Sequence, residues 1–441
     1  MLVHMSQIQL HNLAYAESEH AMAMNALFDT TEYLNQSRPA RMLSYLTAVL
    51  TPAQTFSRCY TLASAAIGRL EYRNALEYID YCIALSEDGA KGLLADLWMK
   101  KGCLHSLLGD NSTALAALDT ALDIDSAAAT DAYYVKMQLL VAEGDMDGAI
   151  DSLEMYLAHV QNGELYGVLG DLYTAEAHYP QAADAYGKAI ALGEAGGHAQ
   201  FMRGISSMQL GDAVAADSDF TAAIDLGMQP AMSRYYRGVM RLSQSRYAEA
   251  EADFAEAMGI AEDAIGIMEL WYNRGVSRMA QGNFDGGAED FLVSAQRGEA
   301  VQDSLFQRGV CLLETGDPHG ADDCFAAYLE HGGSAEQVVY YQAQARMQTG
   351  QYGEAAADFS RCIADGIYPL DSRFYRALCY MAQEAYQLAI DDLTICLDGG
   401  GFDETAPYYR GLCYIALGDV EKGEADLALA VGEVPPLMGA T

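Results

Sequence analysis

Residues 198–226 read HAQFMRGISSMQLGDAVAADSDFTAAIDL and contain two short helical patterns separated by Gly211 and Asp212. Glycine readily adopts the left-handed conformation that ends a helix. Aspartate caps the next helix, because its carboxylate accepts hydrogen bonds from free backbone N–H groups. Gly204 lies inside the first pattern and Phe220 inside the second. The stretch therefore predicts a pair of helices that pack where a small residue meets a large one.

The rest of the chain repeats this pattern from about residue 53. A small residue early in the second helix marks each copy, at Ala75, Ala114, Ala149, Ala182, Ala216, Ala250, Gly287, Ala321, Ala355, Ala389 and Gly423. Most of the intervals are 34 residues, with five extra residues before the second copy and three before the seventh. Such a period is typical of helical repeat proteins, in which each unit packs only on its neighbours. We therefore predict an all-α solenoid of about eleven helix pairs.

Glycines recur at two kinds of place within the copies. Turns between paired helices are predicted at Gly109-Asp110, Gly144-Asp145, Gly211-Asp212, Gly316-Asp317, Gly418-Asp419 and the variant Gly282-Asn283. Inside the first helices stand Gly102, Gly170, Gly204, Gly238, Gly275, Gly309 and Gly411. Each would cost a free helix about 1 kcal/mol, so their recurrence predicts helices that cross too closely for a side chain. The second helices supply the large residue at Leu118, Leu153, Tyr186, Phe220, Phe254, Phe291, Phe325, Phe359, Leu393 and Leu427.

These motifs resemble those of the tetratricopeptide repeat family over residues 53–431. The fourth unit matches best, with Tyr166, Leu169, Gly170, Tyr173, Tyr179, Ala182, Tyr186 and Ala189, and Trp98 and Trp271 match the opening aromatic of the family. The closing proline of the family is absent from these units. The resemblance implies a right-handed superhelix whose first helices line the concave face.

The two ends of the chain lie outside the clear repeat. Residues 1–52 are predicted to form a helical cap or a degenerate repeat, and Thr51 followed by Pro52 is a good helix start. Residues 432–441 form a tail. No polar capping helix follows the last repeat, so either this tail or another molecule covers that end, and the oligomeric state stays open.

Arginine and aspartate recur sixteen residues apart on partner helices. The pairs are Arg203/Asp219, Arg237/Asp253, Arg274/Asp290, Arg376/Asp392 and Arg410/Asp426. We predict an ion pair in each, with a structural role. Cys324 takes the place of the aspartate opposite Arg308, and Asp358 faces Gln342, so the ninth unit is expected to have at most a hydrogen bond here.

A row of aromatic and apolar residues follows the first helices. On the geometry that the resemblance implies, these residues line the concave groove as candidate peptide-binding residues: Phe201, Ile205, Met208, Tyr235, Val239, Tyr272, Val276, Met279, Phe306, Val310, Tyr340, Met347, Phe374, Met381 and Tyr408. Such a surface suits an extended or helical peptide with apolar anchors. The alternative is that the rings pack against neighbouring first helices and are only partly exposed.

Composition excludes several function classes. The net charge of −37 repels phosphate backbones, so no nucleic acid is expected as a direct partner. The acids either keep the outer face soluble or select a basic partner. The nine cysteines show no CxxC spacing and are predicted to be reduced core thiols, as in a cytoplasmic protein. We find no signal peptide, membrane span, metal-binding motif or catalytic motif, and we expect no cofactor and no enzyme activity.

We therefore predict a scaffold that binds a protein or a peptide, with a basic or an apolar face, in its concave groove. Two alternatives stay open. In the first alternative the chain is a regulatory sensor that closes around a peptide signal, as some bacterial cytoplasmic regulators of this repeat family do. In the second it is a substrate-recruiting arm of an enzyme complex.

Overall fold

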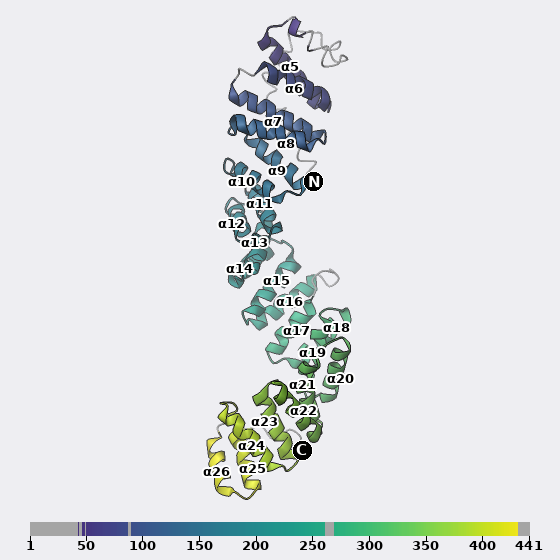
Figure 1. Ribbon diagram of the computed structural model, residues 1–441, viewed down its shortest axis with the longest axis vertical. Coiled ribbons are helices and arrows are strands. Elements are labelled where there is room, and N and C mark those ends of the chain that lie inside the picture. Colours follow the sequence, from purple (N-terminus) through teal and green to yellow (C-terminus); the bar gives the residue numbers. More distant parts are fainter. Residues whose placement is uncertain (1–42, 44–45, 49, 87–89, 261–268, 431–441) are drawn as a thin grey trace. The chain divides into compact units, whose positions relative to one another are not determined.

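The structure is a computed structural model that describes residues 43, 46–48, 50–86, 90–260 and 269–430. Every regular element in this part of the chain is a helix (Figure 1). The predicted cap over residues 1–52 lies almost wholly outside the described residues, and the predicted tail over residues 432–441 lies outside them completely. The chain divides into two compact units, residues 1–211 and 212–441.

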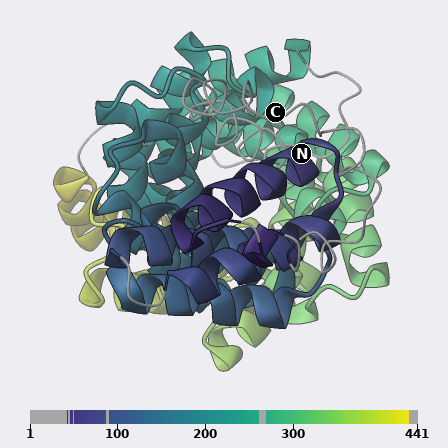
Figure 2. The ribbon, with the colours of Figure 1, turned by 90° about the horizontal axis from the view of Figure 1, so that it is seen from above.

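Unit 1 is a stack of helix pairs in sequence order. Each described helix contacts the next one along the chain, and Figure 2 shows α5 to α8, in purple and blue, packed as neighbours. The helices are α5 (Pro52–Gly68), α6 (Tyr72–Leu85), α7 (Lys91–Leu107), α8 (Asn111–Asp125), α9 (Thr130–Glu143), α10 (Met146–Leu157), α11 (Gly163–Ala175), α12 (Tyr179–Ala191) and α13 (His198–Gln209).

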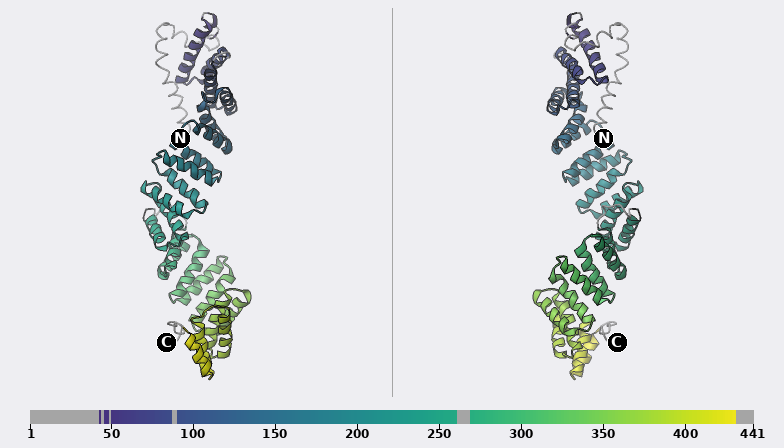
Figure 3. Two further views of the ribbon diagram at one scale, coloured as in Figure 1. Left: turned by 90° about the vertical axis from the view of Figure 1, so that its left-hand side faces the viewer. Right: turned by 90° about the vertical axis from the view of Figure 1, so that its right-hand side faces the viewer.

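Unit 2 is a second stack of the same design (Figure 3). Its helices are α14 (Ala213–Asp225), α15 (Pro230–Ser243), α16 (Tyr247–Ile260), α17 (Leu270–Ala280), α18 (Phe284–Arg297), α19 (Val301–Glu314), α20 (Pro318–Glu330), α21 (Ala335–Gln348), α22 (Tyr352–Asp365), α23 (Pro369–Ala382), α24 (Tyr386–Asp398), α25 (Ala406–Ala416) and α26 (Val420–Leu429). Within each unit the pairing predicted from the sequence period is therefore confirmed, and the fold is an all-α solenoid.

The helix starts obey the predicted capping chemistry. The side chain of Thr51 accepts a hydrogen bond from the backbone of Gln54, whose side chain accepts one from Thr51 in return, so α5 begins with a capping box. The predicted turn residues Asp110, Asp145, Asp212, Asn283, Asp317 and Asp419 each cap the helix that follows. The glycine before each cap has a positive φ between 77° and 88°.

Paired helices cross where the first helix carries a glycine. A Cβ atom added at Gly309 would lie 2.5 Å from Cε1 of Phe325, closer than van der Waals contact allows. The ring of Phe325 itself is fully buried. The same conflict would arise between Gly102 and Leu118, Gly170 and Tyr186, Gly238 and Phe254, and Gly275 and Phe291. The predicted combination of a small and a large residue is thus confirmed as the contact that sets the helix spacing.

The cysteines complete this core. All nine thiols are buried and none forms a disulfide. Burial raises the pKa of Cys379 to about 12 and that of Cys59 to about 11, so these thiols stay protonated near neutral pH. In the described part of the chain, every helix is too short or too polar to span a lipid bilayer.

We predict that Gly309→Ala destabilises the protein. The added methyl group must displace the ring of Phe325, so the free energy of unfolding should fall by about 1–3 kcal/mol, measured by urea denaturation with circular dichroism. Gly353→Ala in α22 is the control, because its Cβ would lie 4.0 Å from the nearest atom, Oε1 of Gln383. That variant should be neutral or more stable by up to about 1 kcal/mol. Equal stability of the two variants would contradict the steric explanation.

Candidate functional site

The predicted groove residues fall into two groups. Five are buried, namely Phe201, Tyr340, Met347, Phe374 and Met381. The others are half-buried, namely Ile205, Met208, Tyr235, Val239, Tyr272, Val276, Met279, Phe306, Val310 and Tyr408. Phe201, Ile205 and Met208 belong to unit 1, and the remaining residues belong to unit 2.

Many of these aromatic rings contact the core phenylalanines of the second helices. Phe325 lies between two successive first helices, with ring centroids 6.1 Å from Phe306 of α19 and 6.0 Å from Tyr341 of α21. Phe359 lies in the same way between Tyr340 and Tyr375. Phe306 also meets Tyr341 edge to face, at 5.3 Å. One side of each first-helix ring is therefore used for packing between repeats, which leaves only its other side for a ligand.

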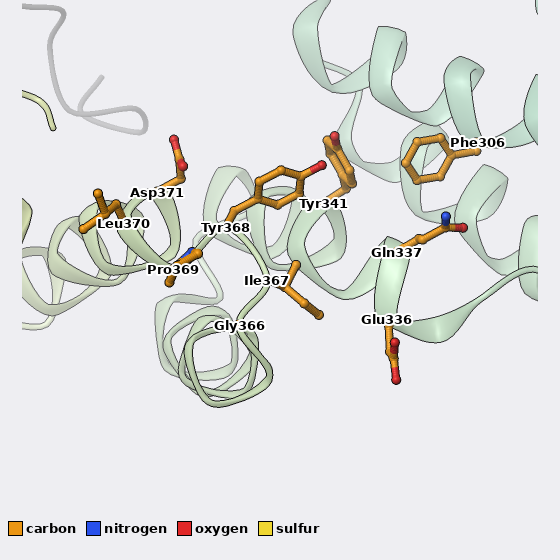
Figure 4. A pocket seen from close by; sticks show the side chains of 10 residues that line it. All are labelled: Phe306, Glu336, Gln337, Tyr341, Gly366, Ile367, Tyr368, Pro369, Leu370 and Asp371. Atoms are coloured by element: carbon orange, nitrogen blue, oxygen red, sulfur yellow. The ribbon is translucent and has the colours of Figure 1, made fainter. Parts of the chain in front are cut away.

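A cleft of about 760 Å³ lies in unit 2 at the amino ends of α21 and α23. It is lined by Phe306, Glu336, Gln337, Tyr341, Gly366, Ile367, Tyr368, Pro369, Leu370 and Asp371. Figure 4 shows the rings of Tyr368, Tyr341 and Phe306 following one another along it, from three successive repeats. Of the residues predicted to bind a peptide, only Phe306 lines this cleft.

Tyr368 is the most exposed of the three rings. It stands before the first residue of α23 with a φ of 41°, in the left-handed region, and 52% of its surface is exposed. Its ring lies 4.8 Å from that of Tyr340, and its phenol lies close enough to that of Tyr341 to help raise the pKa of Tyr341. This backbone conformation places an aromatic side chain at the edge of the cleft, where a turn residue would normally be small.

Sequence reasoning missed most of the cleft. Tyr341 follows directly after the predicted Tyr340, and the same doublet of aromatics recurs at Tyr235-Tyr236, Phe374-Tyr375 and Tyr408-Tyr409. The repeated doublet was a signal that pointed to Tyr341. Tyr368 and Ile367 lie in a loop between repeats, and no periodic pattern marks them.

The phenol of Tyr341 in the cleft is neutral. Burial raises the pKa of Tyr341 to about 12, with a further contribution from the neighbouring phenol of Tyr368. Burial also raises the pKa of Tyr340 well above its usual value. The charged groups that line the cleft are therefore the side chains of Glu336 and Asp371.

A second cleft, of about 700 Å³, lies in unit 1. It is lined by residues 162–164 and 192–196, where two helices begin or end. These residues include three glycines and no aromatic ring. This second cleft lacks the rigid apolar surfaces that usually hold a ligand, so the aromatic cleft of unit 2 is the better candidate for a binding site.

The arginines of unit 2 point toward the second helices. Four predicted ion pairs form, and each is bidentate, as in Arg376, whose Nε and Nη2 both donate to Asp392 at 2.7 Å. The other three are Arg237/Asp253, Arg274/Asp290 and Arg410/Asp426. Arg376 also donates to Ser360 on the second helix of the preceding repeat, at 2.8 Å, so one guanidinium joins two repeats. Arg237 and Arg410 contact Thr221 and Thr394 in the same way.

The prediction for the ninth unit is wrong. Asp358 does not face Gln342 but forms an ion pair with Arg346, twelve residues before it. Gln342 donates instead to Asp322 of the preceding repeat, at 3.3 Å. The spacing of twelve also occurs in Arg241/Asp253 and Arg278/Asp290. An arginine one helical turn further along the first helix therefore reaches the same carboxylate position. The recurring spacing of twelve residues in the sequence would have predicted this pair.

At Arg308 the structure agrees with the sequence. Cys324 occupies the aspartate position. Burial raises the pKa of its thiol, and the nearby guanidinium of Arg308 lowers that pKa by less. Among the described residues, no three His, Cys, Asp or Glu side chains come together as metal ligands would.

We predict that Asp392→Asn destabilises the protein more than Asp358→Asn does. Asp392 is only 3% exposed and neutralises Arg376, so its loss leaves a largely buried guanidinium unpaired, at a cost of about 3 kcal/mol. The side chains of Arg346 and Asp358 are 37% and 22% exposed, so this pair should contribute about 1 kcal/mol or less. Urea denaturation measures both effects, and a larger loss for Asp358→Asn would contradict the burial argument.

Comparisons with known proteins identify the repeat. Two models described as tetratricopeptide repeat match residues 340–394 and residues 95–127. The first match includes Tyr341 and Tyr368 of the cleft. A comparison with curated proteins finds no match.

Several solved structures resemble parts of the chain. They include MamA, which is 21% identical. The match covers 38% of this chain and 90% of MamA, with a TM-score of 0.36. A tetratricopeptide repeat protein from Parabacteroides merdae ATCC 43184 is 18% identical. The match covers 57% of this chain and 98% of that protein, with a TM-score of 0.35. YrrB, described as a TPR protein with an unusual peptide-binding site, is 24% identical. The match covers 43% of this chain and 92% of YrrB, with a TM-score of 0.35.

The family matches agree with the helix pairs and the glycine crossings described above. The chain therefore contains tetratricopeptide repeats, matched at residues 95–127 and 340–394.

Proposed function

We propose that this protein is a non-enzymatic scaffold that holds a segment of a partner protein against the first helices of unit 2. The fold itself supports a protein-protein interaction role, because stacked helix pairs present an extended surface made by successive repeats. The finer proposal is that the segment binds in the aromatic cleft defined by Phe306, Tyr341 and Tyr368.

The observation that carries this proposal is the row of three aromatic rings from three successive repeats. The rings belong to α19, α21 and the turn before α23, so a ligand that touches all three must run across the repeats. An extended peptide has this shape, and a volume of about 760 Å³ accommodates a few of its side chains. The rings are held by contacts with Phe325 and Tyr340, so little side-chain entropy is lost on binding.

The other predicted groove residues extend this surface. Tyr235 and Tyr272 are half-buried first-helix rings of earlier repeats in unit 2, and they contact Phe254 and Phe291 as Phe306 contacts Phe325. We propose that they form weaker contacts along the same bound segment. The buried residues Tyr340, Met347, Phe374 and Met381 of unit 2 are proposed to support the surface from beneath.

We predict that Tyr368→Ala weakens peptide binding. A phage-displayed library of random peptides is selected on the intact chain, and the affinities of synthetic copies of the selected peptides are measured by fluorescence polarisation. Loss of one aromatic anchor should weaken binding about tenfold, since such a contact contributes on the order of 1–2 kcal/mol.

Leu388→Ala provides the matched control. Leu388 on the second helix α24 is 50% exposed, close to the value for Tyr368, and it does not line the cleft. This variant should bind the peptides as the unchanged chain does. A selection that yields no binding peptide, or peptides that bind Tyr368→Ala with unchanged affinity, would refute the proposal for this cleft.

A further inference from the structure

We infer that the aromatic cleft of unit 2 selects a positively charged side chain, a lysine or an arginine, in the bound segment. This inference rests on the proposed function, because it assigns the chemistry of one residue in the peptide that the cleft would hold. It follows from the charges that line the cleft, from the direction of the nearby arginines and from the arrangement of the rings.

The cleft carries negative charge without a positive partner. Glu336 in the first turn of α21 and Asp371 in the first turn of α23 are its charged residues. Among the described residues, neither carboxylate lies within 4.0 Å of a lysine, arginine or histidine nitrogen. In the view of Figure 4 the ring of Tyr368 stands between Asp371 and Tyr341, and Glu336 lies at the opposite end beside Gln337.

The arginines of the same three helices point away from the cleft. Arg376 and Arg373 of α23 both pair with Asp392, Arg346 of α21 pairs with Asp358, and Arg308 of α19 lies near Cys324. All of these partners lie on the second helices α20, α22 and α24. No lysine occurs in α19, α21 or α23. The arginines of this region therefore reach toward the second helices, where all of these except Arg308 meet a carboxylate, while Glu336 and Asp371 stay at the cleft.

The helix ends do not reverse this balance. The amino end of a helix carries about half a positive unit charge, and this charge is screened beyond the first turn. Each of the two helix ends at the cleft already carries one full negative charge, from Glu336 or Asp371. Pro369 also removes one N–H group from the start of α23. The cleft thus has a net negative potential, and a carboxylate or phosphate on the ligand would be repelled.

The rings favour the same ligand. A cation is attracted to the face of an aromatic ring, and three such rings, those of Phe306, Tyr341 and Tyr368, line the cleft. The chain uses this contact elsewhere, with Arg376 placed 5.7 Å from the ring centre of Tyr380 and Arg274 placed 4.7 Å from that of Trp271. Tyr368 and Tyr341 would contact the methylene groups and the charged head of a lysine or arginine, while Asp371 or Glu336 neutralises it.

The test uses the peptides selected on the intact chain. We expect them to share a lysine or an arginine at a fixed distance from an apolar residue. In the synthetic peptide this residue is replaced by citrulline if it is arginine, or by glutamine if it is lysine, which removes the charge and preserves most of the shape. Affinity for the unchanged chain should fall about tenfold, as expected for loss of a charge-assisted contact together with a ring contact.

A double variant of the chain tests whether the cleft carboxylates recognise the positive charge of the peptide. Glu336→Gln with Asp371→Asn should bind the charged and the neutral peptide with nearly equal affinity. The matched control, Asp323→Asn with Glu330→Gln, removes the same charge from exposed positions of the second helix α20. This control should still prefer the charged peptide about tenfold, which separates recognition in the cleft from general attraction to an acidic protein.

The outcomes distinguish the two proposals. Peptides that depend on Tyr368 but contain no shared basic residue, or that bind equally well after neutralisation, would overturn the charge inference and leave the proposed function in place. A preference for charge that is lost equally in the control variant would also overturn the inference. If no selected peptide depends on Tyr368, both proposals fail together.

Discussion

The close crossing of the two helices in each repeat is the contact on which the rest of the molecule depends. At Gly309 the absence of a side chain lets the ring of Phe325 approach to a distance that a Cβ atom would forbid. The ring is then enclosed between Phe306 and Tyr341 of two successive first helices. One steric fact thus sets the spacing within a repeat and the spacing between repeats. The aromatic surface of unit 2 is a consequence of this packing, because rings such as those of Phe306 and Tyr341 that contact the core are only partly buried.

Electrostatics divide the first helices into two sides. On one side, guanidinium groups such as that of Arg376 reach buried carboxylates on the second helices and, through Ser360, the preceding repeat. Burying these pairs offers little net stability, but their directional hydrogen bonds specify how neighbouring helices meet. On the other side, acidic residues such as Asp371 have no internal cation among the described residues. Guanidinium groups such as those of Arg376 and Arg274 are thus used for packing within the stack, while the cleft carries the carboxylates of Glu336 and Asp371.

The candidate site combines a rigid part with a local exception to the repeat. Phe306 and Tyr341 occupy positions that recur in every copy, and their orientation follows from the core. Tyr368 belongs to a connection between repeats and adopts a left-handed backbone conformation. Repeats of one design thereby acquire an individual surface feature through a loop residue, because the loops are not constrained by the packing period.

The sequence by itself determined the helix pairs, their caps and the small and large residues at the crossings, because all of these depend on contacts within one repeat. Bidentate pairs such as Arg376/Asp392 were also predictable, since a spacing of sixteen residues places both groups at the same crossing. Only the tertiary structure decided that Asp358 pairs with Arg346, because two helical positions compete for one carboxylate. It also decided which rings line a cleft, since burial of Tyr340 and exposure of Tyr368 depend on how successive repeats stack and on the backbone of the turn between them.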